Sequence, residues 1–599
     1  MRVSKPGITA AYEDTTILFE GQTIGARRGE SVAATLTANG HLGLRLTATT
    51  GERGLFCGMG VCSECAVRVN GEAGRLACME KVVPGLSVER NPPARPMTVP
   101  PASLSPAAPL PEEVLDCDVL VVGAGPAGLR AAVAASWAGA RVLVIDERAA
   151  GGGQYLKQPA GAIEVDEHGL DAQYRAGREL LREVADSGVA LISGARVWGA
   201  SGPGELYAVS ATRRYVLRGQ ALVLATGAFE RAAPFPGWTL PGVMTTGAAQ
   251  TLLRSYLVAA GTRVLVAGNG PLNFQVAAEL ADAGVRVVAV VEASPLFRLS
   301  NALAAARMSA AAPPYAWQGL SYLRTLARSR VPVLSRSAVI AVAGGDKAEV
   351  ATVARLDRSG WPQPGPGRRF DVDAVCLGLG FVPSSELARS LGCKHRVDDR
   401  SGVLLVERDR NGRTSVPGVW VAGDGGGIGG AQTAQAMGTL AGIDAASSVG
   451  QPVDETVDRR LAERRRAAER ALVRSERFQR SLWHLYSATP LLDQLAGPDT
   501  VVCRCEEVTL AQLAAAAVPW LAAAGPLKRA TRAGMGKCQG RYCGPVLVAL
   551  AARQSGEAVG PYSGFLPQAP VSPVPVSAIA ASAGWGPPVE PGAVPAGSG

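Results

Sequence analysis

Histidine and secretory features are what this sequence most plainly lacks. Its 599 residues include four histidines, and none has a candidate partner nearby in the chain: His41, His168, His395 and His484. We therefore expect neither a histidine-based metal site nor a histidine-dependent catalytic triad. The N-terminus has no apolar core of the kind found in secretory signal peptides. We expect a cytoplasmic location, with peripheral association at a membrane as an alternative.

The prominent apolar runs are interrupted and follow one pattern. VLVVGAGPAGL leads into an apolar run around 131–145, which Arg130 and Arg141 punctuate. Together the runs fit a strand, a glycine-rich turn, a helix and a second strand. Neither reaches the roughly 20 consecutive apolar residues of a membrane helix. The sequence therefore predicts no membrane span.

Composition and charge indicate a globular protein that does not bind nucleic acid. Hydrophobic residues make up 47% of the chain and charged residues 19%, and the net charge of +9 is small for this length. One dense arginine run at 459–480 is interrupted by glutamates at helical spacing, which predicts a solvated helix face. The length corresponds to about four domains.

Four of the eleven cysteines form a first group near the N-terminus. Cys57, Cys62, Cys65 and Cys78 follow C-x4-C-x2-C-x12-C, and the first three have the plant-type [2Fe–2S] spacing. The glycine-bearing loop lets backbone N–H groups reach the sulfurs of such a cluster. Zinc and buried free thiols are the alternatives, but zinc sites favour two C-x2-C pairs and only one occurs here. We predict a [2Fe–2S] cluster.

A first nucleotide-binding unit is indicated by DVLVVGAGPAGL. Gly123, Gly125 and Gly128 have G-x-G-x-x-G spacing between a strand and a helix, and Asp146 ends the next strand. The glycines permit a tight turn, backbone approach to a pyrophosphate and close helix packing. The helix N-terminus attracts phosphates, and Asp146 can accept ribose hydroxyls. An ordinary glycine turn in an α/β sheet is the alternative.

Two later segments favour FAD over NAD for this unit. LVLATGAFERAAPFPG contains a turn at Thr226 and Gly227, and VPGVWVAGD ends in Asp424 before GGGIGG. Both resemble the returning FAD-domain motifs of two-dinucleotide flavoproteins of the disulfide-reductase type, and the resemblance assigns Asp424 to the ribitol chain. The candidate cofactor-binding residues are Gly123, Gly125, Pro126, Ala127, Gly128, Asp146, Glu147, Gln154, Thr226, Gly227, Gly423 and Asp424.

A second nucleotide-binding unit is degenerate. RVLVAGNGPLNFQVAAEL keeps Gly268 and Gly270 but has Asn273 in place of the third glycine, and Glu292 follows at the distance of a ribose-binding acid. In related flavoenzymes the corresponding inserted domain binds NAD(P)H. We expect Asn273 to crowd the helix–strand contact. Two interpretations stay open: an NAD(P) site that uses Gly268, Gly270 and Glu292, or a scaffold without ligand.

Four further cysteines form a second group near the C-terminus. Cys503, Cys505, Cys538 and Cys543 follow C-x-C-x32-C-x4-C, which resembles the helical [2Fe–2S] domain of bacterioferritin-associated ferredoxin. Four thiolates suit zinc as well. We favour a second [2Fe–2S] cluster, because a flavin upstream can exchange electrons with it. The other cysteines, Cys117, Cys376 and Cys393, are expected to be buried apolar residues.

These motifs predict an α/β protein with several domains. It contains two dinucleotide-binding domains of the disulfide-reductase type, an N-terminal β-grasp ferredoxin-like domain and a small helical C-terminal [2Fe–2S] domain. The expected boundaries are 1–91 for the ferredoxin-like domain, 92–113 for a proline-rich linker, 114–236 with 370–450 for the FAD domain, 237–369 for the inserted NAD-like domain, 451–499 for a helical connector, 500–555 for the C-terminal domain and 556–599 for a disordered tail.

The order of these motifs resembles one family of oxidoreductase subunits. With ATGAFERAAPFPGWTLPGVMTTGAAQ, GLGFVPSSELAR and CRCEEVT…GMGKCQGRYC, it is similar to the alpha subunits of opine oxidases, hydrogen cyanide synthase, hydroxyproline or proline dehydrogenases and heterotetrameric sarcosine oxidase. The small ferredoxin-like subunit of the first groups looks fused to the N-terminus here. The resemblance implies a separate FAD-containing beta subunit, similar to D-amino-acid oxidase, that oxidises a C–N bond. Some relatives hold FMN at the subunit interface, and some alpha chains hold NAD or ATP in the first unit.

The resemblance therefore implies an electron-transferring subunit of an amine or amino-acid dehydrogenase or oxidase. Its substrate would be an opine, hydroxyproline, proline, sarcosine or glycine, and its acceptor a quinone, a protein or oxygen. A flavin that converts a two-electron donor to one-electron clusters agrees with this. The sequence shows no acid–base dyad, so we expect no catalytic residue in this chain. The alternative is a stand-alone NAD(P)H-dependent flavin and iron–sulfur reductase, and eight cluster-spaced cysteines argue against a mere scaffold.

Overall fold

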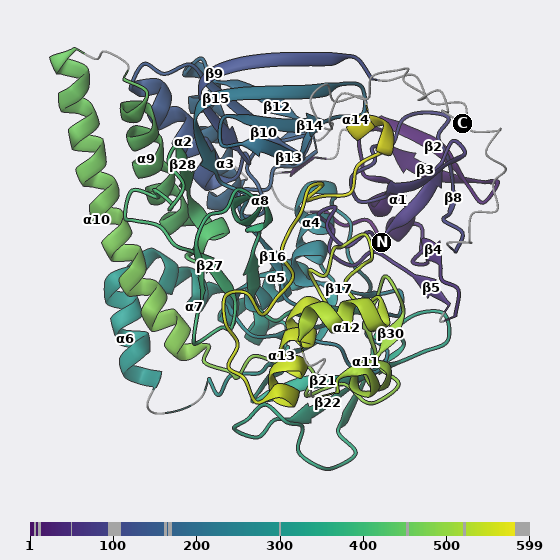
Figure 1. The fold of residues 1–599 in the computed structure, drawn as a ribbon. Helices are drawn as coiled ribbons and strands as arrows, with labels where there is room; N and C mark the ends of the chain where they lie inside the picture. Colours follow the sequence, from purple (N-terminus) through teal and green to yellow (C-terminus); the bar gives the residue numbers. More distant parts are fainter. Residues whose placement is uncertain are drawn as a thin grey trace, which may run out of the picture.

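The computed structural model places most of the chain (Figure 1). The described residues are 1–4, 8–9, 13–49, 51–93, 110–160, 164–165, 170–296, 298, 301–450, 454–518 and 523–580. His168, most of the expected linker and the end of the expected tail lie outside these residues. The short strands β1 (Ile8–Thr9) and β11 (Glu164–Val165) pair antiparallel.

A five-stranded sheet with the order β3-β2-β8-β6-β7 forms the N-terminal part, purple in Figure 1. The β6–β7 hairpin turns at Asn70 and Gly71, which both have the positive φ that this residue pair favours. Ser31 caps α1 by accepting a hydrogen bond from the Ala34 N–H. The elements are β2 (Asp14–Phe19), β3 (Gln22–Arg27), α1 (Val32–Ala38), β4 (Arg45–Leu46), β5 (Glu52–Arg53), β6 (Ala66–Val69), β7 (Glu72–Leu76) and β8 (Ser87–Arg90).

A seven-stranded sheet forms the first nucleotide-binding unit. Its strands β12, β10, β9, β15 and β28 are parallel neighbours, and the Val, Leu and Ile side chains of β10, β15 and β28 and of residues 119–122 in β9 are buried. Helices α2 and α9 pack closely together, with alanine and glycine at the contact. The elements are β9 (Glu112–Val122), α2 (Pro126–Trp137), β10 (Val142–Asp146), α3 (Ala172–Asp186), β12 (Ala190–Ser193), β13 (Arg196–Gly202), β14 (Glu205–Val209), β15 (Arg214–Leu224), β28 (Val419–Val421) and α9 (Gly430–Ser448).

A second parallel sheet, with the order β17-β24-β18-β19-β20, forms the inserted unit. A three-stranded antiparallel sheet and the β16–β25 and β26–β27 pairs flank it. The elements are β16 (Ala228–Glu230), β17 (Val243–Thr245), α4 (Thr246–Tyr256), β18 (Arg263–Gly268), α5 (Pro271–Asp282), β19 (Arg286–Glu292), α6 (Asn301–Ala311), α7 (Pro313–Arg328), β20 (Val333–Ser335), β21 (Ser337–Ala343), β22 (Val350–Arg355), β23 (Arg368–Asp371), β24 (Ala374–Gly378), β25 (Phe381–Pro383), α8 (Glu386–Ser390), β26 (His395–Val397) and β27 (Leu404–Val406).

Helix α10 (Glu455–Leu485) carries the arginine run and packs against α9 and α6. Only Leu461, Ala468, Leu472 and Ser475 of this helix are buried, so most of its arginines face solvent. A compact C-terminal module follows and lies beside the inserted unit in Figure 1. Its elements are β29 (Val501–Cys503), β30 (Val508–Thr509), α11 (Leu510–Ala516), α12 (Ala524–Thr531) and α13 (Gly544–Ser555).

Residues 556–580 contradict the expectation of a disordered tail. Val571 donates its N–H to the Trp198 carbonyl at 2.8 Å, and α14 (Val576–Ala580) buries Ala578 in the apolar cluster around Trp198. Phe565 packs against the core of the C-terminal module. The proline-rich composition concealed these apolar residues, because each one fills a site on a folded neighbour rather than forming a periodic pattern.

Within the part of the chain that the structure describes, we find no helix with both the length and the apolarity needed to cross a bilayer.

Candidate functional site

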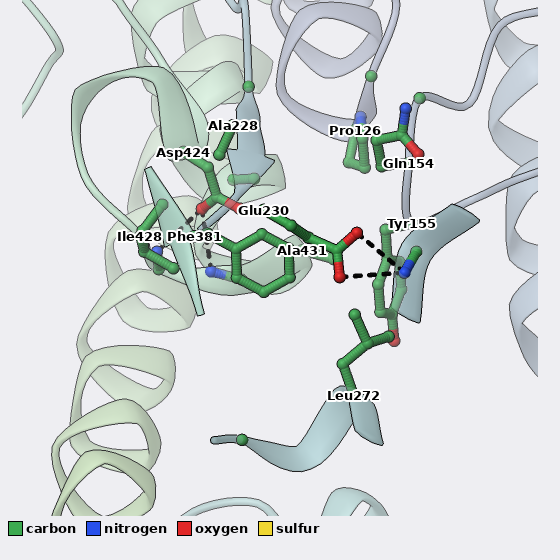
Figure 2. A pocket seen from close by; sticks show the side chains of 18 of the residues that line it. Pro126, Gln154, Tyr155, Ala228, Glu230, Leu272, Phe381, Asp424, Ile428 and Ala431 are labelled. Carbon is green, nitrogen blue, oxygen red and sulfur yellow. Dashed lines mark hydrogen bonds between the residues drawn. The ribbon is translucent and has the colours of Figure 1, made fainter. Parts of the chain in front are cut away.

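A cavity of about 970 Å³ lies between the two nucleotide-binding units. Its walls come from the first glycine turn, the ends of β10 and β16, the start of α5 and helices α6 and α7. Figure 2 shows Pro126, Glu230 and Asp424 around it. Cys57 of the N-terminal cysteine group also lines this cavity. One space therefore borders both a nucleotide turn and a cysteine loop.

The first glycine turn presents a helix N-terminus to the cavity. Helix α2 begins at Pro126 with Gly125 as its N-cap, and Gly123, Gly125, Pro126 and Ala127 line the cavity. The free N–H groups of such a first turn suit a pyrophosphate. A Cβ at Gly128 would lie 1.8 Å from the Gly123 carbonyl oxygen, so only glycine permits this packing of helix on strand.

Asp146, Glu147 and Gln154 line the same cavity, and both acids already have partners. Asp146 accepts hydrogen bonds from the Ala124 N–H at 2.6 Å and the Arg148 N–H at 2.7 Å. Burial raises the pKa of Asp146. Glu147 forms an ion pair with Arg196 at 2.9 Å. Asp146, at the end of β10, therefore holds the glycine turn in shape and also lines the cavity.

Thr226 and Asp424 also line this cavity. The Thr226 hydroxyl donates to the Ser384 carbonyl at 2.5 Å. Asp424 accepts from the N–H groups of Gly429 and Gly430 at 2.9 and 3.1 Å, at the start of α9, and burial raises the pKa of its carboxyl. Gly227 lines the cavity, whereas Gly423 is buried behind it. Asp424 thus orders the loop that leads into α9.

Contrary to our expectation, Asn273 does not crowd the second glycine turn. Its side-chain amide donates to the Gly378 carbonyl at 2.9 Å, and its side-chain carbonyl accepts from the Thr246 hydroxyl at 2.9 Å. The larger side chain is accommodated because both of its polar groups form hydrogen bonds, one to the end of β24 and one to the start of α4. Gly270 lines the cavity, and Gly268 adjoins it at the end of β18.

Glu292 is enclosed at the end of β19. It is fully buried and accepts hydrogen bonds from the N–H groups of Gly270 and Ser294 at 3.1 and 2.8 Å, and burial raises its pKa to about 8. The segment after α10 covers this place: the Ala488 N–H donates to the Ser294 hydroxyl at 3.0 Å, and the Asn269 amide donates to the Tyr486 carbonyl at 3.4 Å. A ribose cannot reach Glu292 in this arrangement.

The sequence did not indicate three buried polar residues that line the cavity, Lys157, Gln250 and Glu230. Lys157 donates to Gln250 at 2.9 Å, and Glu230 accepts the Gly247 N–H with both oxygens at 3.0 and 2.9 Å (Figure 2). Burial lowers the pKa of Lys157 to about 7 and raises that of Glu230 to about 7. Cavity-lining groups with such pKa values can exchange protons near neutral pH. Their separation in sequence concealed them, although Lys157 follows Gln154 closely.

The N-terminal cysteines lie as two pairs. The thiols of Cys57 and Cys62 are within hydrogen-bonding reach of each other, as are those of Cys65 and Cys78. Burial opposes ionisation of Cys57, but hydrogen bonds from the Cys62 thiol and the Met59 N–H outweigh it and lower the pKa of Cys57 to about 6. This arrangement suits two iron ions, each held by two thiolates.

The C-terminal cysteines show the same arrangement. Cys503 lies against Cys543, and Cys505 against Cys538. The hydrogen bond from Cys543 is the main reason that the pKa of Cys503 falls to about 7, with burial acting in the opposite direction. Among the described residues, no three His, Cys, Asp or Glu side chains converge on a point that could hold a single ion. Four thiols in two pairs would suit a two-iron cluster, with two thiolates on each iron.

The two cysteine groups belong to one buried region. Cys57, Cys62 and Cys538 share an apolar cluster with Tyr542. The Tyr542 ring lies 5.3 Å from the Phe56 ring, centre to centre. The nucleotide cavity, the N-terminal thiols and the C-terminal thiols are therefore contiguous.

This fold and site define a class: an oxidoreductase with two dinucleotide-binding units and an iron–sulfur domain. The family described as pyridine nucleotide-disulphide oxidoreductase matches residues 117–438, and a 2Fe-2S iron-sulfur cluster binding domain matches residues 13–93. A sarcosine oxidase A3 domain matches residues 499–583. The flavoprotein-type fold and the N-terminal [2Fe–2S] domain that the sequence predicts are therefore confirmed.

The chain belongs to the family of the opine oxidase A subunits, with an N-terminal 2Fe–2S domain. It is 34% identical to the opine oxidase A subunit of Rhizobium meliloti (strain 1021), a match that covers 77% of this chain and 98% of the relative. It is 32% identical to the HcnB subunit of hydrogen cyanide synthase from Pseudomonas aeruginosa, over 77% of this chain and 97% of that one. The predicted resemblance and the oxidoreductase class are thus confirmed.

One solved structure has a similar fold over nearly the whole chain. L-Proline dehydrogenase from P. horikoshii superposes with a TM-score of 0.67 and covers 95% of this chain and 98% of its own, at 20% identity. At this identity the likeness shows the fold alone. The relatives are named as subunits of oxidases and of a synthase, so this chain is of a type found in heteromeric enzymes.

Proposed function

We propose that this chain relays electrons within a heteromeric amine or amino-acid dehydrogenase or oxidase. The observation that carries the proposal is the continuity of the site: Cys57 lines the nucleotide cavity and also belongs to the apolar cluster that contains Cys538. A carrier in the cavity would therefore lie beside one cysteine group, and that group beside the other. A stepwise path for single electrons needs such adjacency.

The residues fit the cofactors that this function requires. The α2 N-terminus, Asp146, Thr226 and Asp424 would hold FAD, and the paired thiols of each cysteine group would hold a [2Fe–2S] cluster. An FMN shared with a partner at a subunit interface is part of the proposal. Bound flavin supplies the conversion of a two-electron donor into one-electron steps. We keep the domain limits predicted from the sequence as part of the proposal, except that the folded chain continues to about residue 580 in a segment that packs on the first nucleotide-binding unit.

The cavity residues have defined tasks in this proposal. The glycine turn binds the pyrophosphate through backbone N–H groups, and Glu147 with Arg196 closes one wall. Lys157 and Glu230, buried in the same cavity, hold the proton that accompanies a two-electron transfer and release it when electrons leave singly. They do so without a histidine.

The partner would be a flavoprotein that oxidises the substrate. The relatives, named as opine oxidase A subunits and as the HcnB subunit of hydrogen cyanide synthase, support a C–N-bond-oxidising complex. We propose a D-amino-acid-oxidase-like beta subunit that acts on an opine, hydroxyproline, proline, sarcosine or glycine, and a quinone, protein or oxygen as acceptor.

A stand-alone NAD(P)H-dependent reductase is the second candidate, and one observation speaks against it. Glu292 is enclosed by its own backbone partners, and Tyr486 and Ala488 bond to Asn269 and Ser294 beside it. A nicotinamide dinucleotide would have to displace this segment before its ribose could bind. A segment that opens in solution would restore this candidate.

Anaerobic visible spectroscopy of the purified chain tests the choice. We expect flavin and cluster absorbance that NADH leaves unchanged and dithionite bleaches, together with about four irons and four labile sulfides per chain. Cys62→Ser should remove the N-terminal cluster's signal and leave the flavin bound. Rapid bleaching by NADH would instead establish the reductase, and a chain without iron or flavin would refute both.

A further inference from the structure

One buried ion pair joins the two cysteine groups directly. Glu64 lies between Cys62 and Cys65 in the first group, and Arg504 lies between Cys503 and Cys505 in the second. The Arg504 Nε–H donates to Glu64 Oε2 at 2.8 Å. Their side chains are 4% and 1% exposed, so this contact is shielded from water. A residue that lies between two cysteines of the first group thus contacts a residue that lies between two cysteines of the second group, although 440 positions separate them in the sequence.

Arg504 is held on every side by other contacts. Its Nη1 donates to the Trp238 carbonyl at 2.7 Å, and its guanidinium lies 4.0 Å from the Phe56 ring centre and 4.6 Å from that of Trp238. The Trp238 indole N–H donates in turn to the Val501 carbonyl at 2.6 Å. The planar fork and the stacking on two rings are features that only arginine provides.

Positive charge is concentrated at this junction. Arg45 donates to the second oxygen of Glu64 at 2.5 Å, and the Arg53 Nε lies 3.7 Å from Glu64. Arg53 also pairs with Glu507, two residues beyond Cys505, at 3.5 Å. Three arginines therefore surround two glutamates between two sets of thiols. Charge of this sign stabilises thiolate-bound clusters, which are anionic and become more so on reduction.

We propose that the Glu64–Arg504 pair is a positioning clamp that couples the two metal sites. It fixes the two cysteine loops relative to each other, and it completes a covalent and hydrogen-bonded route from Cys62 through Glu64 and Arg504 to Cys503 and Cys505. One electron leaves one cluster and enters the other, and no bond breaks and no proton moves, because arginine stays protonated. The inference rests on the proposed function, since it requires clusters at both cysteine groups.

The charge of Arg504 and the geometry of its guanidinium group predict different effects of substitution. Arg504→Lys keeps the charge but cannot bond Glu64 and Trp238 in the same fork. Arg504→Gln loses the charge as well. We expect both variants to weaken the coupling between the clusters, and only Arg504→Gln to make both midpoint potentials more negative. A merely structural role would not separate these two measurements.

The experiment compares the full chain, reconstituted with iron and sulfide, as wild type, R504K, R504Q and E64Q. Iron is quantified, each cluster is titrated potentiometrically, and the electron paramagnetic resonance of the fully reduced chain is recorded for spin–spin broadening. We expect broadening in the wild type, and at least a threefold loss of it in R504K and R504Q at unchanged iron content. Arg254→Lys is the control, because Arg254 is equally buried and pairs with Asp171 and Glu279 away from the cysteines.

The outcomes separate the clamp from the proposed function. About two irons per wild-type chain would refute the two-cluster relay and the clamp together. Four irons with no spin–spin broadening in the wild type, or with undiminished broadening in R504Q, would overturn the clamp alone. R504Q could lose iron because one buried charge is left unpaired. In that case the spin–spin broadening of R504K and E64Q, which keep the buried volume, is compared with that of the wild type instead.

Discussion

At the scale of single residues, Glu230 and Lys157 are buried ionisable groups of the cavity whose pKa values are shifted. Both are fully enclosed, and burial moves their pKa values toward each other, to about 7 in each case. Neither group is fully charged at neutral pH. Burial destabilises each charged form by more than its hydrogen bonds and neighbouring charges stabilise it. Each group can therefore take up or release a proton near neutral pH.

Glu230→Gln should remove a loss of stability with rising pH. Between about pH 4.5 and 7 the unfolded chain ionises Glu230 while the folded chain keeps the proton, so the free energy of unfolding falls as pH rises through this window. Glutamine stays neutral and can still accept from Gly247. We expect the variant to gain about 2–3 kcal/mol on the wild type between pH 4.5 and pH 8, measured by urea denaturation.

Gln154→Ala is the control for this titration, since Gln154 lines the same cavity but carries no ionisable group. It should leave the pH dependence of stability unchanged. Parallel curves for Glu230→Gln and the wild type would show that Glu230 is ionised throughout the range and would contradict the proton-holding role.

At the scale of elements, the turn between β9 and α2 depends on close backbone packing. Helix α2 starts one residue after the N-cap Gly125, and its first turn rests on the carbonyl of Gly123. The helix can present its N–H groups to a phosphate only because Gly128 has no side chain. The same contact therefore supports both the fold and the nucleotide site.

Gly128→Ala should disrupt this element and its ligand together. The added Cβ would lie 1.8 Å from the Gly123 oxygen, so the helix must shift. We expect a loss of about 3 kcal/mol in stability and of most bound flavin, measured by thermal denaturation and by absorbance after gel filtration. Gly202→Ala, where a Cβ meets nothing within 4 Å, is the matched control and should change stability by less than about 0.5 kcal/mol. Full flavin retention in Gly128→Ala would refute the assignment of this turn.

At the scale of the whole molecule, the last described segment packs back onto the first nucleotide-binding unit. Residues 571–580 lie on β13 and β14 of that unit, beyond the C-terminal module that precedes them in sequence. The segment covers Trp198, which is only 1% exposed. Arg541 of the C-terminal module donates to the Val571 carbonyl at 2.9 Å, which ties the two regions together.

A truncation that removes residues 571–599 should loosen this part of the first unit. Exposure of the Trp198 cluster removes about 2–4 kcal/mol of apolar burial, and β13 and β14 should exchange their amide hydrogens faster. Hydrogen–deuterium exchange with mass spectrometry measures both strands directly. A truncation after Ala580 keeps α14 and serves as the control. Equal protection in the two truncated chains would show that α14 does not stabilise the sheet.

The sequence predicted those parts of the site whose residues lie close together in the chain. The glycine turn at 123–128 and the cysteine spacing of 57–65 are local, because one backbone segment must bend around one ligand. Asn273 was misjudged for the opposite reason. Whether a side chain crowds a turn depends on its neighbours, here Gly378 and Thr246 from other elements.

The sequence by itself determined the fold class, the two nucleotide-binding units, the family and the grouping of eight cysteines. Tertiary structure alone decided which groups share a space: Lys157 meets Gln250, Tyr486 covers Asn269, and Arg504 reaches Glu64. Local patterns follow from backbone geometry over a few residues, which the sequence encodes directly. Contacts across hundreds of residues follow from how packed sheets and helices meet, and burial then sets the pKa of each group that they enclose.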